Sequence, residues 1–529
     1  MTVAGLLGCV LSLAAATAVP AQDSCFGEKP ICRQVMGLDA SVSNMTDADI
    51  KAQLNDRWAL DVLRSGRYPL EISAILEVMA DVSLQRGYTR RTFLVAEGGK
   101  LRAPPPDYPK DFRFVTHWSA DDQPNLFLGT PPSGDRSTFL EVIAWDANKG
   151  AFNYYERNQI GEQHVWIWRG DTRHAFDPRT RTKGCLACHV AGTLVMKELE
   201  RPWNNWNSEV SGIDSFPADF GMPATVQQNS LERLIRRGIN FTAEMRIDAA
   251  NGSLSELLSP LLETRAANLV SSMVRSDFTG SPSDAMPFPV DFFLNVKAFN
   301  RLGLSIGSIK VDLPRAGYLA AVERLGFKLR RRESPFEQPG DTFFGALTPA
   351  MAVEDLVHLG VLLDRNLVTP EAAAALLMVD FPNPVFSPKR ASLAPHLSGL
   401  TVADAAGTAL LPRLVTLVEQ ATVGQPACNV AALDACSGEQ QFLHYAKLAQ
   451  SPGWSDAFLS ALRDYTTAVG ERLANDAGAA DDYVALLAWR RQLFRGFRIA
   501  ESPLLFPTVE QTVQPHSMTS SGKVIVAPQ

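Results

Sequence analysis

The stretch STFLEVIAWDANKGAFNYYERNQIGEQHVWIWRG, residues 137–170, decides the fold that the sequence predicts. It contains three runs rich in β-branched and aromatic residues, at 137–146, 151–157 and 164–170. The turn-forming tetrapeptides ANKG and QIGE separate these runs, a pattern typical of β-hairpins. We therefore predict an antiparallel meander of strands in this stretch.

Helical patterns flank the meander on both sides. Between residues 46 and 87 apolar residues recur at helical spacing, and Thr46 is suited to cap the first helix. After residue 208 apolar stripes dominate, and two segments there open with Thr-Pro, at 348–349 and 369–370. Threonine as cap followed by proline is a typical helix start.

These patterns predict an α+β chain in which a small antiparallel β domain is followed by a large, mainly α-helical domain. We expect an N-terminal helical region over 22–110 and a β-rich domain over 111–207. Residues 208–529 are expected to form an α-rich C-terminal domain, for which the sequence indicates no role.

Residues 1–21, MTVAGLLGCVLSLAAATAVPA, form an apolar leader that ends in small residues. This pattern predicts a secretory signal peptide, although no Lys or Arg precedes the apolar run. We therefore expect a periplasmic or otherwise exported protein. No later segment reaches the ~20 apolar residues of a membrane helix, so we predict no membrane span.

The charge balance bears on the partners of the chain. The 529 residues carry a net charge of -7, whereas a nucleic-acid-binding protein needs a positive surface. We therefore expect no nucleic-acid partner.

Four of the seven cysteines form two close pairs, Cys25 with Cys32 and Cys428 with Cys436. An exported protein meets an oxidising compartment, so each pair is predicted to form a disulfide that closes a short loop. Free buried thiols are the alternative, because pairing cannot be deduced from sequence alone.

The segment KGCLACHVAG, residues 183–192, carries the strongest chemical signal. Cys185, Cys188 and His189 form a C-x-x-C-H unit, which is typical of c-type haem attachment. Two thiols at this spacing can each form a thioether with a vinyl group on one haem edge, and the adjacent imidazole can reach the iron. We predict one covalent haem c, attached through Cys185 and Cys188, with His189 as iron ligand.

Three other interpretations of this unit remain open. A zinc knuckle needs a fourth ligand, and no other cysteine is near in sequence. A thioredoxin-like redox pair needs its first cysteine at a helix start in a βα context. An ordinary disulfide or a pair of buried thiols is the third. Haem attachment is favoured because all five residues match and the leader independently predicts export.

Residues 185–189 resemble the attachment signature of c-type cytochromes, which implies covalent haem. More widely, residues 111–207 are similar to the β-sheet cytochromes c-prime and their hydroxylamine-oxidising relatives, with aromatic strands followed by C-x-x-C-H and GTLVMKELERPWNNW. The hydroxylamine-oxidising group crosslinks its haem to a strand lysine. Lys149, the only lysine in 111–170, falls in a predicted turn, so the c-prime-like form without a crosslink fits better.

The sixth iron ligand is left open between His174, Met196 and no protein group. His174 lies in the loop before the haem unit, whereas Met196 follows His189 too closely to reach the opposite face of a haem easily. His358, on an otherwise apolar predicted helix, is expected to be a hydrogen-bonded core histidine.

Three functions are compatible with these features. The first is an exported monohaem c-type cytochrome, a redox protein with electron-transfer activity and a redox partner protein. The second is a haem enzyme or gas-binding protein whose open iron site takes nitrogen oxides or peroxide as small-molecule ligands. The third is a partner-binding protein in which the haem domain is an accessory.

Overall fold

The largest sheet in the computed structural model has eight strands in the order β2-β1-β8-β7-β6-β5-β4-β3. Its strands are β1 (Ile31–Arg33), β2 (Ser43–Asn44), β3 (Thr89–Ala96), β4 (Phe112–Ser119), β5 (Leu126–Thr130), β6 (Leu140–Asp146), β7 (Ala151–Ile160) and β8 (Gln163–Asp171). From β3 to β8 the neighbours along the chain pair antiparallel. β1 pairs with β8 in parallel, so the sheet is mixed.

The structure describes residues 31–96, 112–130, 140–194, 237–270, 285–307, 311–330, 337–339, 348–496 and 513–527, apart from gaps of one or two residues within these ranges. The predicted leader and Cys25 lie outside this part of the chain.

The predicted fold class, a small antiparallel β domain followed by a large mainly α-helical domain, is wrong. The sheet is large and mixed, and it runs from Ile31 to Asp171 rather than within 111–207. β1 and β2 have only three and two residues, too short to show the period-two pattern of a strand. The pairing of β1 with β8 is a long-range contact that local pattern cannot reveal. The meander itself, β6 to β8, is confirmed.

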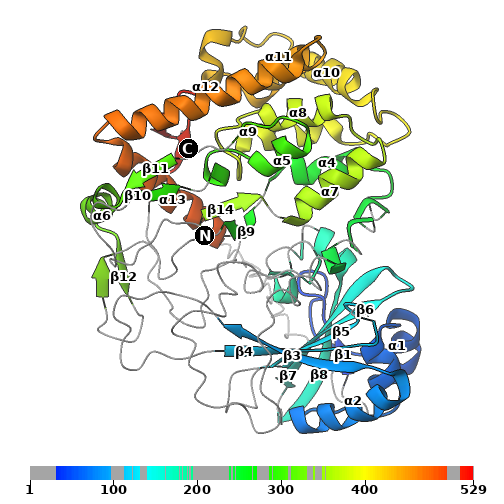
Figure 1. Ribbon diagram of the computed structural model, residues 1–529. Helices are drawn as coiled ribbons and strands as arrows, with labels where there is room; N and C mark the ends of the chain where they lie inside the picture. Colours follow the sequence, from blue (N-terminus) through cyan, green and yellow to red (C-terminus); the bar gives the residue numbers. More distant parts are fainter. Residues whose placement is uncertain are drawn as a thin grey trace, which may run out of the picture.

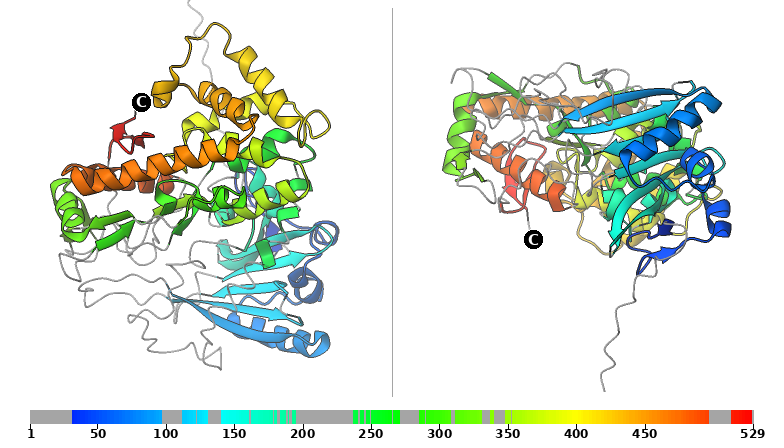
Figure 2. Two further views of the ribbon diagram at one scale, coloured as in Figure 1. Left: turned by 45° about the horizontal axis from the view of Figure 1, so that its top comes forward. Right: turned by 90° about the horizontal axis from the view of Figure 1, so that it is seen from below.

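Three helical segments between β2 and β3 lie against one side of this sheet (Figures 1 and 2). They are α1 (Asp47–Gln53), η1 (Ala59–Leu63) and α2 (Ile72–Arg86). Thr46 caps α1 as predicted, in a capping box with Asp49. Across the interface the rings of Trp58 and Trp166 meet edge to face at 5.1 Å, which joins this layer to β8.

A buried carboxyl group ties the same layer to β7. Asp56 accepts hydrogen bonds from Tyr155 Oη at 2.5 Å, Asn153 Nδ2 at 2.7 Å and the backbone N of Ala59 at 3.0 Å. Burial raises the pKa of Asp56 to about 6, and the three hydrogen bonds only partly oppose that rise.

The rest of the described chain is mainly helical and has a separate apolar core. Its helices are α4 (Leu254–Leu262), α5 (Val296–Arg301), α6 (Arg315–Arg324), α7 (Val353–Asp364), α8 (Pro370–Met378), α9 (Pro388–Ala391), α10 (Leu410–Ala421), α11 (Gly438–Ala449), α12 (Trp454–Asn475) and α13 (Ala479–Gly496), with short helical turns η6 (Val290–Phe292), η7 (Ala394–Leu397) and η8 (Val430–Ala435). Short strand pairs accompany them, formed by β9 (Ala266–Val270), β10 (Ala285–Phe288), β11 (Val311–Pro314), β12 (Lys328–Arg330), β13 (Glu337–Pro339), β14 (Thr348–Met351), β15 (His516–Met518) and β16 (Val524–Val526).

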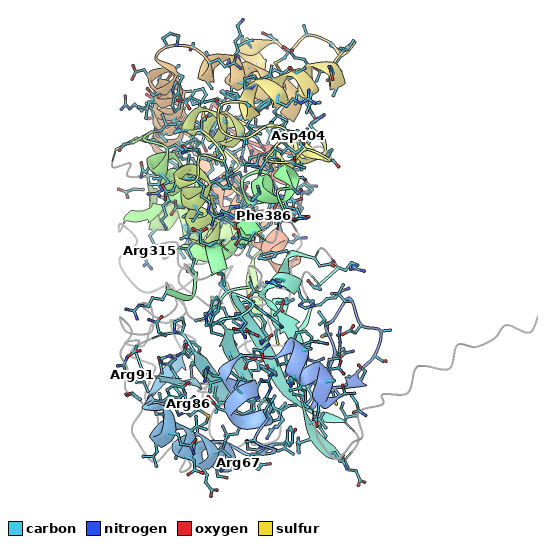
Figure 3. All side chains as sticks on the ribbon, turned by 90° about the vertical axis from the view of Figure 1, so that its right-hand side faces the viewer. Arg67, Arg86, Arg91, Arg315, Phe386 and Asp404 are labelled. Carbon is cyan, nitrogen blue, oxygen red and sulfur yellow. A yellow bond between two sulfur atoms is a disulfide. The ribbon has the colours of Figure 1, made fainter. Side chains whose placement is uncertain are left out.

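The helical region stacks on the sheet, with α10, α11 and α12 at the far end (Figures 1 and 2). In a side view Arg67 and Arg86 mark the sheet end and Asp404 the helical end (Figure 3). None of the helices in the described ranges has both the length and the apolar character needed to cross a membrane.

One of the two predicted Thr-Pro helix starts is confirmed. The side chain of Thr369 accepts from the backbone N of Ala372 and caps α8, with Pro370 in the first turn. Thr348 instead begins β14, which pairs with β9, and α7 starts only at Val353. Both segments begin with the same Thr-Pro signal, so the pairing of β14 with β9 determines that Thr348 starts a strand instead of capping a helix.

The predicted Cys428–Cys436 disulfide is confirmed, with a Cα–Cα distance of 5.6 Å.

Candidate haem-attachment site

The C-x-x-C-H unit follows directly from the edge of the meander. After β8 the chain makes a short helical turn, η2 (Thr172–Phe176), and then a second one, η3 (Gly184–Ala187). The backbone N of His189 donates to the carbonyl of Cys185 at 2.9 Å, so these residues are four apart within one turn. The thiol of Cys185 is half-buried. Cys188 lies outside the described residues.

The imidazole of His189 is held in one tautomer. Its Nδ1 lies 2.9 Å from the backbone carbonyl oxygen of Thr193, and a carbonyl can only accept. Nδ1 therefore carries the proton, and in the neutral ring Nε2 carries the lone pair that can bind a metal. A histidine ligand commonly shows this second contact, which fixes its orientation.

The loop after His189 needs glycine at one position. Gly192 has a φ of 67°, and its backbone N donates to the carbonyl of His189 at 2.9 Å. A Cβ at Gly192 would lie 2.6 Å from Cγ2 of Thr172 and 2.7 Å from its carbonyl oxygen. The residue after Gly192, Thr193, has its carbonyl oxygen 2.9 Å from Nδ1 of His189.

Tyr154, from β7, forms the sheet side of the site. Its hydroxyl donates to the same Thr193 carbonyl at 3.1 Å, and its ring centre lies 5.2 Å from that of His189. Burial raises the pKa of Tyr154 well above the usual value, so the phenol stays neutral. His189 and Thr193 are only 3% and 1% exposed, which makes this a dry environment for the imidazole.

The helical region also contributes a residue to this site. Thr193 Oγ1 donates to Oε1 of Glu354, at the start of α7, over 3.2 Å. Burial raises the pKa of Glu354 to about 7, with a further rise from Asp355 and a partly opposing effect of Arg246. Thr193 thus contacts His189 through its carbonyl and α7 through its side chain.

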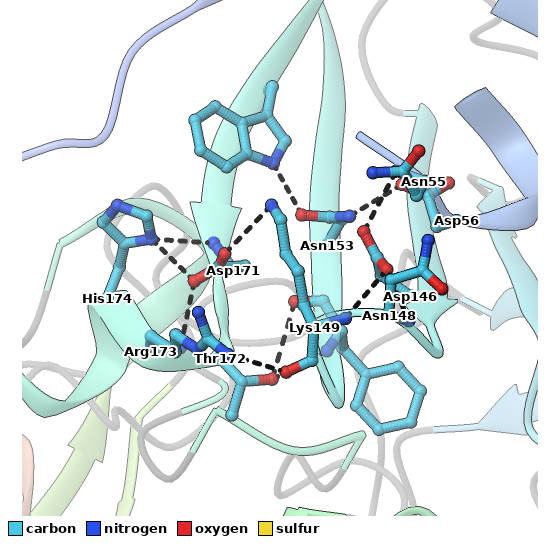
Figure 4. A network of polar contacts seen from close by, with 12 residues as sticks. Asn55, Asp56, Asp146, Asn148, Lys149, Asn153, Asp171, Thr172, Arg173 and His174 are labelled. Atoms are coloured by element: carbon cyan, nitrogen blue, oxygen red, sulfur yellow. Dashed lines mark hydrogen bonds and ion pairs between the residues drawn. The ribbon is translucent and has the colours of Figure 1, made fainter. Parts of the chain in front are cut away.

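His174 lies in η2, within a polar network at the end of β8 (Figure 4). Its Nδ1 is 2.8 Å from Oδ1 of Asp171, and Lys149 Nζ is 3.3 Å from Oδ2 of the same carboxylate. Burial opposes ionisation of Asp171, but His174 and Lys149 together lower its pKa to about 2. The ring of Trp168 packs edge to face against that of His174 at 5.5 Å. His174 therefore has a local capping role, and its part as sixth ligand stays a prediction.

The remaining residues singled out in the sequence are Met196, Lys149 and His358. Met196 lies outside the described residues. Lys149 is in the turn between β6 and β7, as expected. His358 is in the core as predicted, but only one of its ring nitrogens is satisfied. Its Nε2 lies 2.8 Å from the carbonyl of Leu257, whereas Nδ1 is buried without a hydrogen-bond partner among the described residues, and burial lowers the pKa of His358 to about 3.

Sequence pattern did not reveal three residues of this site, namely Tyr154, Thr193 and Glu354. Thr193 follows the C-x-x-C-H unit but is not part of it, and Tyr154 is one of several consecutive buried residues of β7, at a register shift between Tyr154 and Tyr155. Glu354 is 161 residues from Thr193, so no local signal could have linked the two.

A second group of polar side chains lies apart from this site, around a cavity of about 590 Å³ in the helical region. Asp380 and Phe386 line it with φ values of 51° and 58°, a backbone region that favours glycine. Ser387 Oγ donates to Asp380 Oδ2 at 2.6 Å, and Arg490 lines the same cavity. The position of Phe386 can be followed in Figure 3. No motif in the sequence marks this cavity.

Within the described ranges no group of three or more His, Cys, Asp or Glu side chains could hold a metal ion. Comparison with known proteins found no matching family model, no matching curated protein and no matching solved structure.

Proposed function

We propose that this chain is an exported monohaem c-type cytochrome that transfers electrons. One haem would be bound through thioethers to Cys185 and Cys188, with His189 as axial ligand. The observation that carries the proposal is the contact between His189 Nδ1 and the Thr193 carbonyl at 2.9 Å. It supports the proposal because it leaves Nε2, the atom that would bind iron, as a lone-pair donor.

The surroundings of His189 fit such a group. The half-buried thiol of Cys185 is joined to His189 by a backbone hydrogen bond across one turn, and the imidazole itself is buried. When bound, the haem supplies a one-electron redox couple. The chain holds the imidazole in one orientation and excludes water from it, which are two of the means by which a protein sets a haem potential.

The first experiment measures covalent attachment. The full chain is expressed in a host with a c-type maturation system and analysed by intact mass and visible absorption. We expect the mass of the processed chain plus one haem, and no attached haem in a Cys185→Ser, Cys188→Ser double variant. The matched control is Cys428→Ser with Cys436→Ser, which removes two cysteines elsewhere and should keep the haem. A colourless wild-type protein with the mass of the bare chain contradicts the proposal.

A second experiment separates electron transfer from an open-site function. We expect the spectrum of the reduced protein to be unchanged by carbon monoxide, as for a six-coordinate iron. If His174→Ala then binds carbon monoxide and Met196→Leu does not, His174 is the sixth ligand, and the reverse result identifies Met196. Carbon monoxide binding by the wild type would replace the carrier function with that of a gas-binding protein or enzyme.

The export part of the proposal rests on the leader at residues 1–21. We expect cell fractionation to recover the mature chain outside the cytoplasm, with an N-terminus near Gln22. Recovery of the full-length chain in the cytoplasm, with its leader retained, would contradict it.

A further inference from the structure

The start of α7 lies against the loop that follows the haem-attachment unit. Thr193 Oγ1 donates to Glu354 Oε1 at 3.2 Å, and both residues are almost completely buried, at 1% and 2% exposed. On the same helix Val353 and Val357 pack against the core of the sheet region. The helical region therefore supplies one wall of the histidine site.

Thr193 connects His189 to Glu354 through two hydrogen bonds. The Thr193 carbonyl accepts from His189 Nδ1 and from Tyr154 Oη, while its hydroxyl donates to Glu354. One residue therefore connects the imidazole, the sheet and α7. A displacement of the Thr193 side chain would move the carbonyl that holds the imidazole.

The first turn of α7 is itself anchored. Asp355 forms a partly buried ion pair with Arg246 at 3.1 Å, and the Arg246 guanidinium lies 5.9 Å from the ring centre of Phe176 in η2. One turn later His358 Nε2 contacts the Leu257 carbonyl at 2.8 Å. The first turn of α7, which carries Glu354, is thus held by contacts with both the sheet region and the helical region, as a positioning residue requires.

We propose that Glu354 is a positioning residue for His189: through Thr193 it holds the carbonyl that orients the axial imidazole. This inference rests on the proposed haem function in so far as it concerns a redox potential. It gives residues of the helical region a role in tuning the haem, which the sequence did not indicate. A histidine that donates firmly through Nδ1 is a more basic ligand and favours the oxidised iron.

The test compares Glu354→Leu, which removes the acceptor, with Glu354→Gln, which keeps an oxygen for the Thr193 hydroxyl. Potentiometric titration of the haem-loaded protein is expected to show a higher reduction potential for Glu354→Leu and a value close to wild type for Glu354→Gln. Glu371→Leu, in the first turn of α8, is the matched control and should leave the potential unchanged. If Glu354→Leu does not fold, Thr193→Val breaks the same contact and leaves α7 intact.

A second readout does not depend on haem. In the haem-free protein, NMR of the His189 Nδ1 proton is expected to show slow exchange with water in the wild type and in Glu354→Gln, and fast exchange in Glu354→Leu. A wild type without attached haem would overturn the proposed function, while this proton would still test the positioning.

Two results would overturn the positioning role itself. Potential and proton exchange in Glu354→Leu that equal the wild type would show that Thr193 stays in place without Glu354. Equal shifts in Glu354→Gln and Glu354→Leu would show that the charge of Glu354 matters and its hydrogen bond does not.

Discussion

Asp56 should make the stability of this protein depend on pH in an unusual direction. Its pKa rises from the ordinary 3.8 to about 6 because the carboxyl group is completely buried. A carboxyl whose pKa is higher in the folded protein adds to the free energy of unfolding. This contribution is complete below pH 3.8 and is lost as the pH rises through about 6. The sign is thus opposite to that of a salt-bridged carboxylate.

The size of the effect follows from the two pKa values. The rise from 3.8 to about 6 is worth about 3 kcal/mol, at about 1.4 kcal/mol for each factor of ten in proton affinity. Between pH 4 and pH 7.5 we expect about 2.5 kcal/mol of this to disappear, because at pH 4 some unfolded chains are already ionised at this residue. Asp56→Asn resembles the protonated acid at every pH, so it should lack this pH dependence.

The assay is urea-induced unfolding followed by tryptophan fluorescence at several pH values. The free energy of unfolding of the wild type relative to Asp56→Asn should fall by about 2.5 kcal/mol from pH 4 to pH 7.5. Asp81→Asn is the control: its exposed pair with Arg67 should contribute at most a few tenths of a kcal/mol. If the wild type and Asp56→Asn stay parallel over this range, the three hydrogen bonds balance burial, the pKa of Asp56 is not raised, and the reasoning fails.

Three further changes should be visible in thermal or chemical unfolding. Arg390→Met should cost roughly 3–5 kcal/mol, because the buried guanidinium donates to one hydroxyl and three carbonyl oxygens, of which the Pro384 carbonyl also accepts from Asn295 Nδ2; a loss under 1 kcal/mol would contradict this. Replacing Cys428 and Cys436 by serine should cost about 2 kcal/mol, since the disulfide closes a loop of sequence separation 8, and should remove the part of the reductant sensitivity that this disulfide causes; an unchanged response to reductant would contradict this. Gly192→Ala should cost about 1–3 kcal/mol through its positive φ and its contact with Thr172, and an unchanged melting temperature would show that the loop can rearrange.

The sequence predicted those parts of the fold whose signals are local. The runs at 137–146, 151–157 and 164–170 became β6, β7 and β8, because each run is rich in β-branched and aromatic residues and is bounded by turn residues. The cap at Thr46 follows from the same local chemistry. The extent of the sheet could not be predicted, since β1 is recruited by parallel pairing with a strand distant in sequence.

The same distinction applies to the candidate site. The C-x-x-C-H unit is visible because covalent attachment requires thiols and imidazole at a fixed spacing along one short segment. The residues that would tune an axial histidine need only proximity in space, so Tyr154 comes from a strand and Glu354 from a helix 161 residues beyond Thr193. Thr348 and Thr369 make the same point within the helical region, since one Thr-Pro begins a strand and the other a helix. A motif can therefore predict a cofactor, whereas the properties that the cofactor would have depend on long-range contacts. For this reason variants of Glu354 should affect the potential of the proposed haem without affecting its attachment.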